Sequence, residues 1–102
     1  MAPDIYRDLI LTQGDLPPSL RSVLAERVHQ DRKWGEQNHD PFAYLTILTE
    51  EVGEMAQAAL HARFGGPAAE KLREEAVQAA AVALAIVECL DRGKWKWPEA
   101  AK

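Results

Sequence analysis

The sequence predicts an all-α fold. Proline and glycine residues divide the 102 residues into about three helical segments. Within these segments apolar residues recur at spacings of three and four, which is the period of an amphipathic helix. No segment of the sequence shows the alternation of apolar and polar residues that a half-buried strand requires. These observations together indicate helices packed against helices.

The first substantial helix is expected from about residue 18 to residue 34. The segment before it, up to Leu16, could hold a short helix, but its helical pattern is weak and Pro17 and Pro18 interrupt it. Gly35 is a natural stop for the helix. Its apolar stripe consists of Leu20, Val23, Leu24, Arg27 and Val28. One face of this helix is therefore expected to be buried.

The second helix is expected from Pro41 to about Phe64. Asp40 is a good N-cap, because its carboxylate can accept hydrogen bonds from free amides, and proline at the first helical position lacks only an unneeded donor. One apolar stripe is formed by Leu45, Leu48, Val52, Ala56 and Ala59. A neighbouring stripe carries Ile47, Glu51, Glu54 and Ala58. Core residues and carboxylates are therefore expected on adjoining faces.

The third helix is expected to begin at Pro67 and to end near Arg92, with Gly93 as its C-terminal cap. The link through Gly65 and Gly66 is so short that the second and third helices must form an antiparallel hairpin. The sequence therefore predicts an antiparallel helical bundle within a single domain, 1–102, whose core spans about 18–92.

The third helix is apolar nearly all round from Ala79 to Val87, so it needs partners on more than one side. A chain of this length also forms only a small core by itself. Both observations predict that the bundle is completed by oligomerisation, as a homodimer or a homotetramer.

Composition excludes several other classes of protein. A net charge of −4 and a pI near 5.3 make nucleic acid an unlikely partner, because binding to nucleic acid requires a basic face. The longest apolar stretch, 76–90, contains Gln78 and Glu88 and is too short to span a bilayer. Cys89 is the only cysteine and lies in an apolar run, which indicates a buried thiol in the cytoplasm. No secretory signal is evident in the first eleven residues.

Residues 94–102 form a tail in which lysine and tryptophan alternate before Pro98. We expect the tryptophans to anchor this tail against the bundle. The alternative is an element that contacts phosphates or stacks on bases.

The second helix carries the sequence Glu50-Glu51-Val52-Gly53-Glu54. Glu51 and Glu54 are three residues apart and project to one side, whereas Glu50 and Glu54 form a repelling pair four residues apart. They lie too far from the helix start for the helix dipole to offset the repulsion. Mg²⁺ would offset it, since this ion prefers oxygen ligands and is commonly shared between carboxylates and phosphates. The alternative is an exposed acidic face paired with lysine or arginine.

The third helix supplies a similar pair, Glu75 and Gln78, again three residues apart. If the hairpin folds as expected, Glu54 and Glu75 are about equally far from the turn and can face one another. Carboxylates projecting inward from facing helices are a recurring way to build a metal site. Gln78 alone is more typical of a polar residue at the entry to an apolar helix.

In this order and spacing, Glu50-Glu51-x-x-Glu54 followed by Glu75-x-x-Gln78 resembles the paired acidic motif of the MazG-like all-α nucleotide pyrophosphohydrolases. Upstream, Lys33-Trp34-Gly35-x-Gln37 is similar to the segment that precedes this motif in many small bacterial and phage-type members. The resemblance covers about 27–92, which is most of the chain.

The resemblance implies a Mg²⁺-dependent enzyme, with Mn²⁺ as an alternative ion, that hydrolyses a nucleoside triphosphate (NTP or dNTP) to the monophosphate and pyrophosphate in nucleotide-pool clean-up. It implies that Glu51, Glu54 and Glu75 hold the metal. Gln78 would complete or support the metal site. Glu50 would position the attacking water or act as a base.

One position departs from the family pattern. The second motif usually ends in aspartate, whereas Gln78 offers a neutral carbonyl oxygen and no charge. This departure favours weaker metal binding or a metal ligand from elsewhere. It also keeps open a rival interpretation, a helical oligomer with weak or no turnover that acts as a nucleotide-binding or interaction protein.

Further substrate contacts are expected from residues around these motifs. Trp34 can stack on a base and Gln37 can hydrogen-bond to its edge, although a tryptophan at the end of an amphipathic helix is more often a core residue. Lys33, Lys71 and Arg73 can meet phosphates, and each is alternatively a solvated surface charge.

Overall fold

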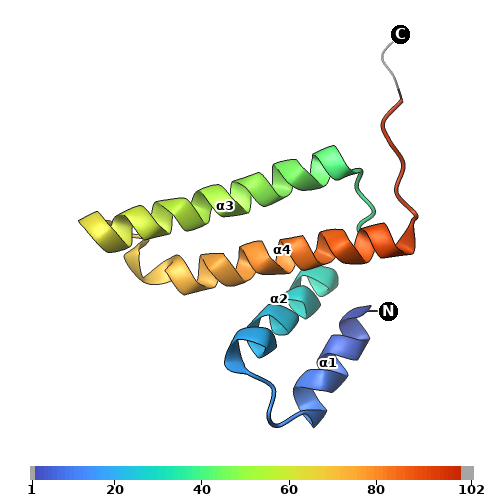
Figure 1. Ribbon diagram of the computed structural model, residues 1–102, viewed down its shortest axis with the longest axis horizontal. Helices are drawn as coiled ribbons and strands as arrows, with labels where there is room; N and C mark the ends of the chain where they lie inside the picture. The colour runs from blue at the N-terminus through green and yellow to red at the C-terminus, as the bar shows by residue number, and fades with distance from the viewer. Residues whose placement is uncertain (1, 100–102) are drawn as a thin grey trace.

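The computed structural model describes residues 2–99, and within them it is helical with no strand (Figure 1). The all-α class predicted from the sequence is confirmed. The helices are α1 (Ala2–Thr12), α2 (Pro18–Trp34), α3 (Pro41–Phe64), the short 3-10 helix η1 (Ala69–Lys71) and α4 (Leu72–Arg92).

Helices α3 and α4 lie side by side and are joined at one end by the segment 65–71 (Figure 1). Helix α4 also contacts α2, and α1 packs on α2, so α4 is the central element of the chain. The described part of the chain measures 48 × 42 × 18 Å. Its radius of gyration of 15.6 Å exceeds the value of about 13 Å expected for a compact chain of this length. A single copy therefore forms a thin, open layer.

Asp40 and Gly93 cap the helix ends as predicted. The Asp40 carboxylate accepts hydrogen bonds from the amides of Phe42 and Ala43, at 2.9 and 3.1 Å. Gly93 adopts a left-handed conformation, with φ 67° and ψ 22°, and its amide donates to the carbonyl of Cys89. These caps fix where α3 begins and where α4 ends.

The opening segment, where the sequence allowed a short helix, forms the helix α1 over Ala2–Thr12. Contacts with α2 and α4 hold it in place. The guanidinium of Arg21 donates to the carbonyl oxygens of Ile10 and Gln13, at the end of α1. The Tyr6 hydroxyl donates to Glu88 of α4 at 2.7 Å. These hydrogen bonds connect α1 to α2 and to α4.

The expected start of the third helix at Pro67 is wrong, because α4 begins only at Leu72. The intervening residues form a turn and η1. Here the amide of Ala68 donates to Nδ1 of His61 at 3.1 Å. The His61 ring lies so close to Gly66, whose φ is +152°, that a Cβ there would approach it to 2.4 Å. The His61 side chain, which belongs to α3, therefore shapes the turn.

The buried apolar residues are mostly small and cluster on α4 and the residues facing it. They are Leu24, Tyr44, Ala58, Ala79, Ala81, Val82, Ala85 and Cys89. The burial predicted for Cys89 is confirmed. Within residues 2–99, no helix is long and apolar enough to cross a membrane.

The apolar stripe expected to be the core of α3 is not buried within one chain. Leu45 is 53% exposed and Val52 is 43% exposed. The neighbouring stripe, which includes Glu51 and Ala58, turns toward α4 instead. Helix α4 likewise leaves Val87 exposed. The expectation failed because the apolar pattern does not show whether the partner of a face lies in the same chain.

The tail is held by aromatic and charged contacts. The rings of Phe42 and Trp97 lie 5.2 Å apart, and those of Trp95 and Trp97 lie 5.0 Å apart. Nζ of Lys94 lies 3.6 Å from Oε2 of Glu36. These contacts agree with the interpretation of the tail as an aromatic anchor, as far as residue 99.

Candidate metal centre and adjoining pocket

Three carboxylates converge between α3 and α4. Glu51 and Glu54 project from α3, and Glu75 projects from α4. One oxygen from each lies within 4.8 Å of the others. The spacing of three residues on α3 and the side-by-side packing of the two helices bring them together. Three carboxylate oxygens so close together form a ligand set suited to a hard divalent cation.

Two oxygens of this cluster lack a partner. Glu51 Oε2 and Glu75 Oε2 are buried, and neither has a hydrogen-bond partner among the described residues. Leaving a buried polar atom unsatisfied typically costs about 1–3 kcal/mol, and more for a charged group. A cation held between these oxygens would remove that cost. The residues present therefore fit Mg²⁺.

The pKa values of Glu51 and Glu75 are raised by their burial and by the neighbouring carboxylates. Burial raises the pKa of Glu51, and the negative charges of Glu54, Glu26 and Glu50 raise it further. Burial also raises the pKa of Glu75, as do hydrogen bonding to Glu54 and the charges of Glu54 and Glu51. Without a cation, the cluster therefore tends to retain protons.

These shifts predict a pH dependence of stability in the absence of metal. Because both pKa values are raised above the ordinary 4.5, the folded protein binds more protons than the unfolded chain above that pH. The contribution of Glu51 and Glu75 to the free energy of unfolding is thus fully retained below pH about 4.5. It is lost as pH rises through the raised pKa values. Urea unfolding in EDTA should show this fall. Identical pH profiles for wild type and Glu51→Gln/Glu75→Gln would contradict it.

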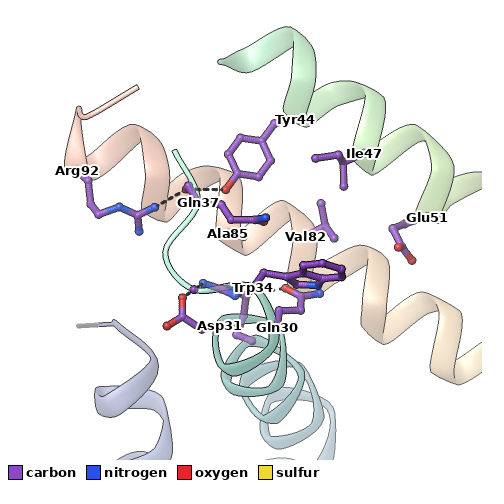
Figure 2. A pocket seen from close by; sticks show the side chains of 12 residues that line it. Gln30, Asp31, Trp34, Gln37, Tyr44, Ile47, Glu51, Val82, Ala85 and Arg92 are labelled. Carbon is purple, nitrogen blue, oxygen red and sulfur yellow. Dashed lines mark hydrogen bonds and ion pairs between the residues drawn. The ribbon is translucent and has the colours of Figure 1, made fainter. Parts of the chain in front are cut away.

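A pocket of about 130 Å³ adjoins the cluster (Figure 2). It lies between the end of α2 and the first half of α3, and Val82 and Ala85 of α4 form its floor. Glu51 belongs to both the pocket and the cluster, so the two are continuous. The pocket is lined by Arg27, Gln30, Asp31, Trp34, Gly35, Gln37, Tyr44, Ile47, Glu51, Val82, Ala85 and Arg92.

The loop between α2 and α3 is fixed at the pocket by hydrogen bonds to the backbone of Gln37. Its carbonyl oxygen accepts from the Tyr44 hydroxyl at 2.9 Å and from the Arg92 guanidinium at 2.8 Å (Figure 2). Arg92 also donates to Asn38 at 3.0 Å. The loop is therefore held by α3 and α4 together, and its position is defined without a ligand.

Some of the predicted substrate contacts lie at this pocket. Trp34 and Gln37 both line it. Lys33 is exposed, and its ammonium lies 4.9 Å from the centre of the Trp34 ring. Gln78 is half-buried on α4, one turn beyond Glu75 toward the pocket floor.

Three other predicted site residues lie outside both the convergent carboxylates and the lining of the pocket. Glu50 is exposed and does not belong to the convergent set. Lys71 and Arg73 are exposed near the start of α4 and do not line the described pocket. Arg73 instead donates to the hydroxyl of Ser22 on α2 at 3.0 Å. Their distance from the pocket follows from their position beside the α3–α4 turn.

Sequence reasoning missed a buried charged network beside the pocket. Arg27 Nε lies 3.0 Å from Glu88 Oε2, and both side chains are buried. Burial and the hydrogen bond to Glu88 raise the pKa of Tyr6 to about 12. A signal was present, because Arg27 stands in the apolar stripe of α2 and Glu88 in the apolar stretch of α4.

Comparison with protein-family models, curated proteins and solved structures finds no match for this chain. The MazG-like resemblance thus rests on the sequence motifs alone.

Proposed function

We propose that this chain is a Mg²⁺-dependent nucleoside triphosphate pyrophosphohydrolase of the MazG-like kind, which releases a nucleoside monophosphate and pyrophosphate. The observation that carries the proposal is the convergence of Glu51, Glu54 and Glu75 with two buried, unpartnered oxygens beside a pocket. The motif resemblance supplies the reaction class.

Glu51, Glu54 and Glu75 would hold the metal, and Gln78 would support the site with a neutral oxygen. When bound, Mg²⁺ would neutralise phosphate charge and lower the pKa of a bound water. Mn²⁺ is an alternative ion for the same oxygens. Glu50, which is exposed beside this cluster, remains the candidate base that accepts a proton from the attacking water.

The order of residues along the helices supports an orientation for the substrate. On α3, Tyr44 and Ile47 line the pocket, Glu51 is shared, and Glu54 belongs only to the cluster. The nucleobase of the substrate would therefore occupy the pocket, and its phosphates would extend toward the carboxylate cluster. Lys33, Lys71 and Arg73 remain candidate phosphate contacts from the sequence, and none of them lines the pocket.

A pyrophosphate-release assay with a panel of ribo- and deoxyribonucleoside triphosphates tests the proposal. Release should require Mg²⁺ or Mn²⁺ and should cease in EDTA. Nucleotide binding without release would instead support the rival function, a helical oligomer that binds nucleotides without turnover. Gln78 in place of an acidic residue is the observation that favours this rival.

Gln78→Asp tests whether residue 78 belongs to the metal site. The substitution adds a charged oxygen ligand, so Mg²⁺ should bind more tightly and raise the melting temperature more than in wild type. In EDTA the variant should be destabilised, since a further half-buried carboxylate lacks a cation. Thermal melts with and without Mg²⁺ measure both effects. Equal metal-induced shifts in the two proteins would remove Gln78 from the site.

We also propose that the bundle is antiparallel and is completed by a second copy of the chain, as a dimer or a dimer of dimers. Exposed apolar residues follow α3 and α4 and include Leu45, Val52, Leu60, Val87 and Leu90. Light scattering should therefore show more than one subunit, and Val87→Asp should weaken the assembly. A monodisperse wild-type monomer at micromolar concentration would contradict this expectation.

A further inference from the structure

We propose that the groove between α1 and α2 is a second interface between copies of this chain, and that it receives the outer side of α1 from a partner copy. The proposed contact through α3 and α4 gives no role to this part of the molecule. With both contacts, the assembly is a dimer of dimers. The composition of the groove, the exposed side chains beside it and its separation from the candidate site support this interface.

The groove is lined by apolar and basic residues. It holds about 410 Å³ between the two helices. Its lining consists of Arg7, Ile10 and Leu11 from α1 and Ala25, Val28, His29 and Arg32 from α2. On each helix these residues recur at spacings of three and four, so each helix presents one continuous stripe. No carboxylate of the described residues lines the groove, although the net charge of the chain is −4.

The two arginines of the groove have charges available to a partner. Arg7 and Arg32 are exposed, and neither forms an ion pair within residues 2–99. Between them lie apolar side chains, of which Leu11 is 72% exposed. A surface that complements this groove must therefore combine an apolar side chain with carboxylates.

The outer side of α1 has this composition. Asp4, Asp8 and Leu11 are spaced by four and three residues, so they lie on one side of the helix. All three are exposed, and neither carboxylate forms an ion pair in the described part of the chain. In a contact about a two-fold axis the same surface occurs on both copies, so Leu11 can line one groove and enter the other. The two carboxylates then approach Arg7 and Arg32 of the second copy.

The groove is separate from the candidate nucleotide site. On α2, the pocket beside the carboxylate cluster is lined by Arg27, Gln30, Asp31 and Trp34. These residues and the α2 residues of the groove differ by nearly half a helical turn, so they occupy opposite sides of α2. Figure 1 shows α1 and α2 on one side of α4 and α3 on the other. A copy docked on the groove therefore leaves α3 free to contact another copy.

Two variants of opposite charge test this interface. Asp4→Lys/Asp8→Lys makes the outer side of α1 as basic as the groove, and Arg7→Glu/Arg32→Glu makes the groove as acidic as the outer side of α1. Each variant should repel copies of itself at this contact, so light scattering should give half the mass of the wild-type assembly. An equimolar mixture should recover the wild-type mass, because each basic surface then meets an acidic surface on the other variant.

Leu11→Lys tests the apolar centre of the same contact. It places a charge in the groove and should also halve the mass. Ile5→Lys is the matched control, since Ile5 is an apolar residue of the same helix that is 60% exposed and does not line the groove. This variant should keep the wild-type mass. Circular dichroism measures the helical content of every variant.

A monomeric wild type would overturn the interface. An unchanged mass in Leu11→Lys, or a mixture of the two charge variants that keeps the reduced mass, would also overturn it. If a charge variant does not fold, the comparison of Leu11→Lys with Ile5→Lys still decides the question. A mass that Val87→Asp halves and Leu11→Lys leaves unchanged would refute this interface and retain the contact through α3 and α4.

Discussion

Glu51→Gln is expected to reduce Mg²⁺-dependent hydrolysis of a triphosphate by on the order of 10²–10³-fold, because a metal ion supplies several kcal/mol of charge stabilisation. Glu51 is the most informative residue to substitute, because it belongs to both the cluster and the pocket and has an unpartnered buried oxygen. Glutamine keeps the shape of the side chain and removes only its charge. Steady-state rates across a Mg²⁺ titration measure the loss.

A matched control distinguishes this effect from a general loss of negative charge. Glu74→Gln removes an exposed carboxylate next to Glu75, outside the convergent set, and should retain the wild-type rate. Glu51→Gln should also be as stable as wild type in EDTA, or more stable, because like-charge repulsion with Glu54 and Glu75 is relieved. Full activity in Glu51→Gln, or its unfolding, would show that Glu51 is not a metal ligand.

Arg27→Met should destabilise the folded protein by about 3–5 kcal/mol, because it leaves the charge of Glu88 buried and uncompensated. The side chains of Arg27 and Glu88 are only 6% and 8% exposed, so water cannot replace the missing partner without rearrangement. Glu88 also accepts from Tyr6, so the loss should loosen α1 from α4. Urea unfolding at neutral pH measures the change in free energy.

The double variant Arg27→Met/Glu88→Leu provides the internal comparison. With both charges replaced by apolar groups, no charge remains buried without a partner, and most of the stability should return. If Arg27→Met costs less than about 1 kcal/mol, the pair contributes no more than a surface salt bridge does. That outcome would contradict the description of the network as a buried structural element.

The helix boundaries that follow from local chemistry were predictable from the sequence. Asp40 and Pro41 define the start of α3, and Gly93 defines the end of α4, because capping depends on a few adjacent residues. For α1 the sequence indicated only that a short helix was possible. Its hydrogen bond from Tyr6 to Glu88 joins residues 82 positions apart, which no local pattern could predict.

The candidate site likewise contains residues that the sequence pattern predicted and residues that it missed. The register of Glu51, Glu54 and Glu75 followed from helical periodicity and the short turn, and the structure brings these three together. The buried pair of Arg27 and Glu88 was missed, because it joins residues that lie 61 positions apart in the sequence. Periodicity shows which face of a helix a residue occupies, and tertiary packing decides what that face meets.

Pyrophosphohydrolase activity can be measured directly by following one triphosphate with ³¹P NMR in the presence of wild-type protein and Mg²⁺. We expect equal amounts of nucleoside monophosphate and pyrophosphate, no accumulation of diphosphate or free phosphate, and no reaction in EDTA. Formation of the diphosphate with inorganic phosphate, or an unchanged triphosphate spectrum across the whole nucleotide panel, would contradict it.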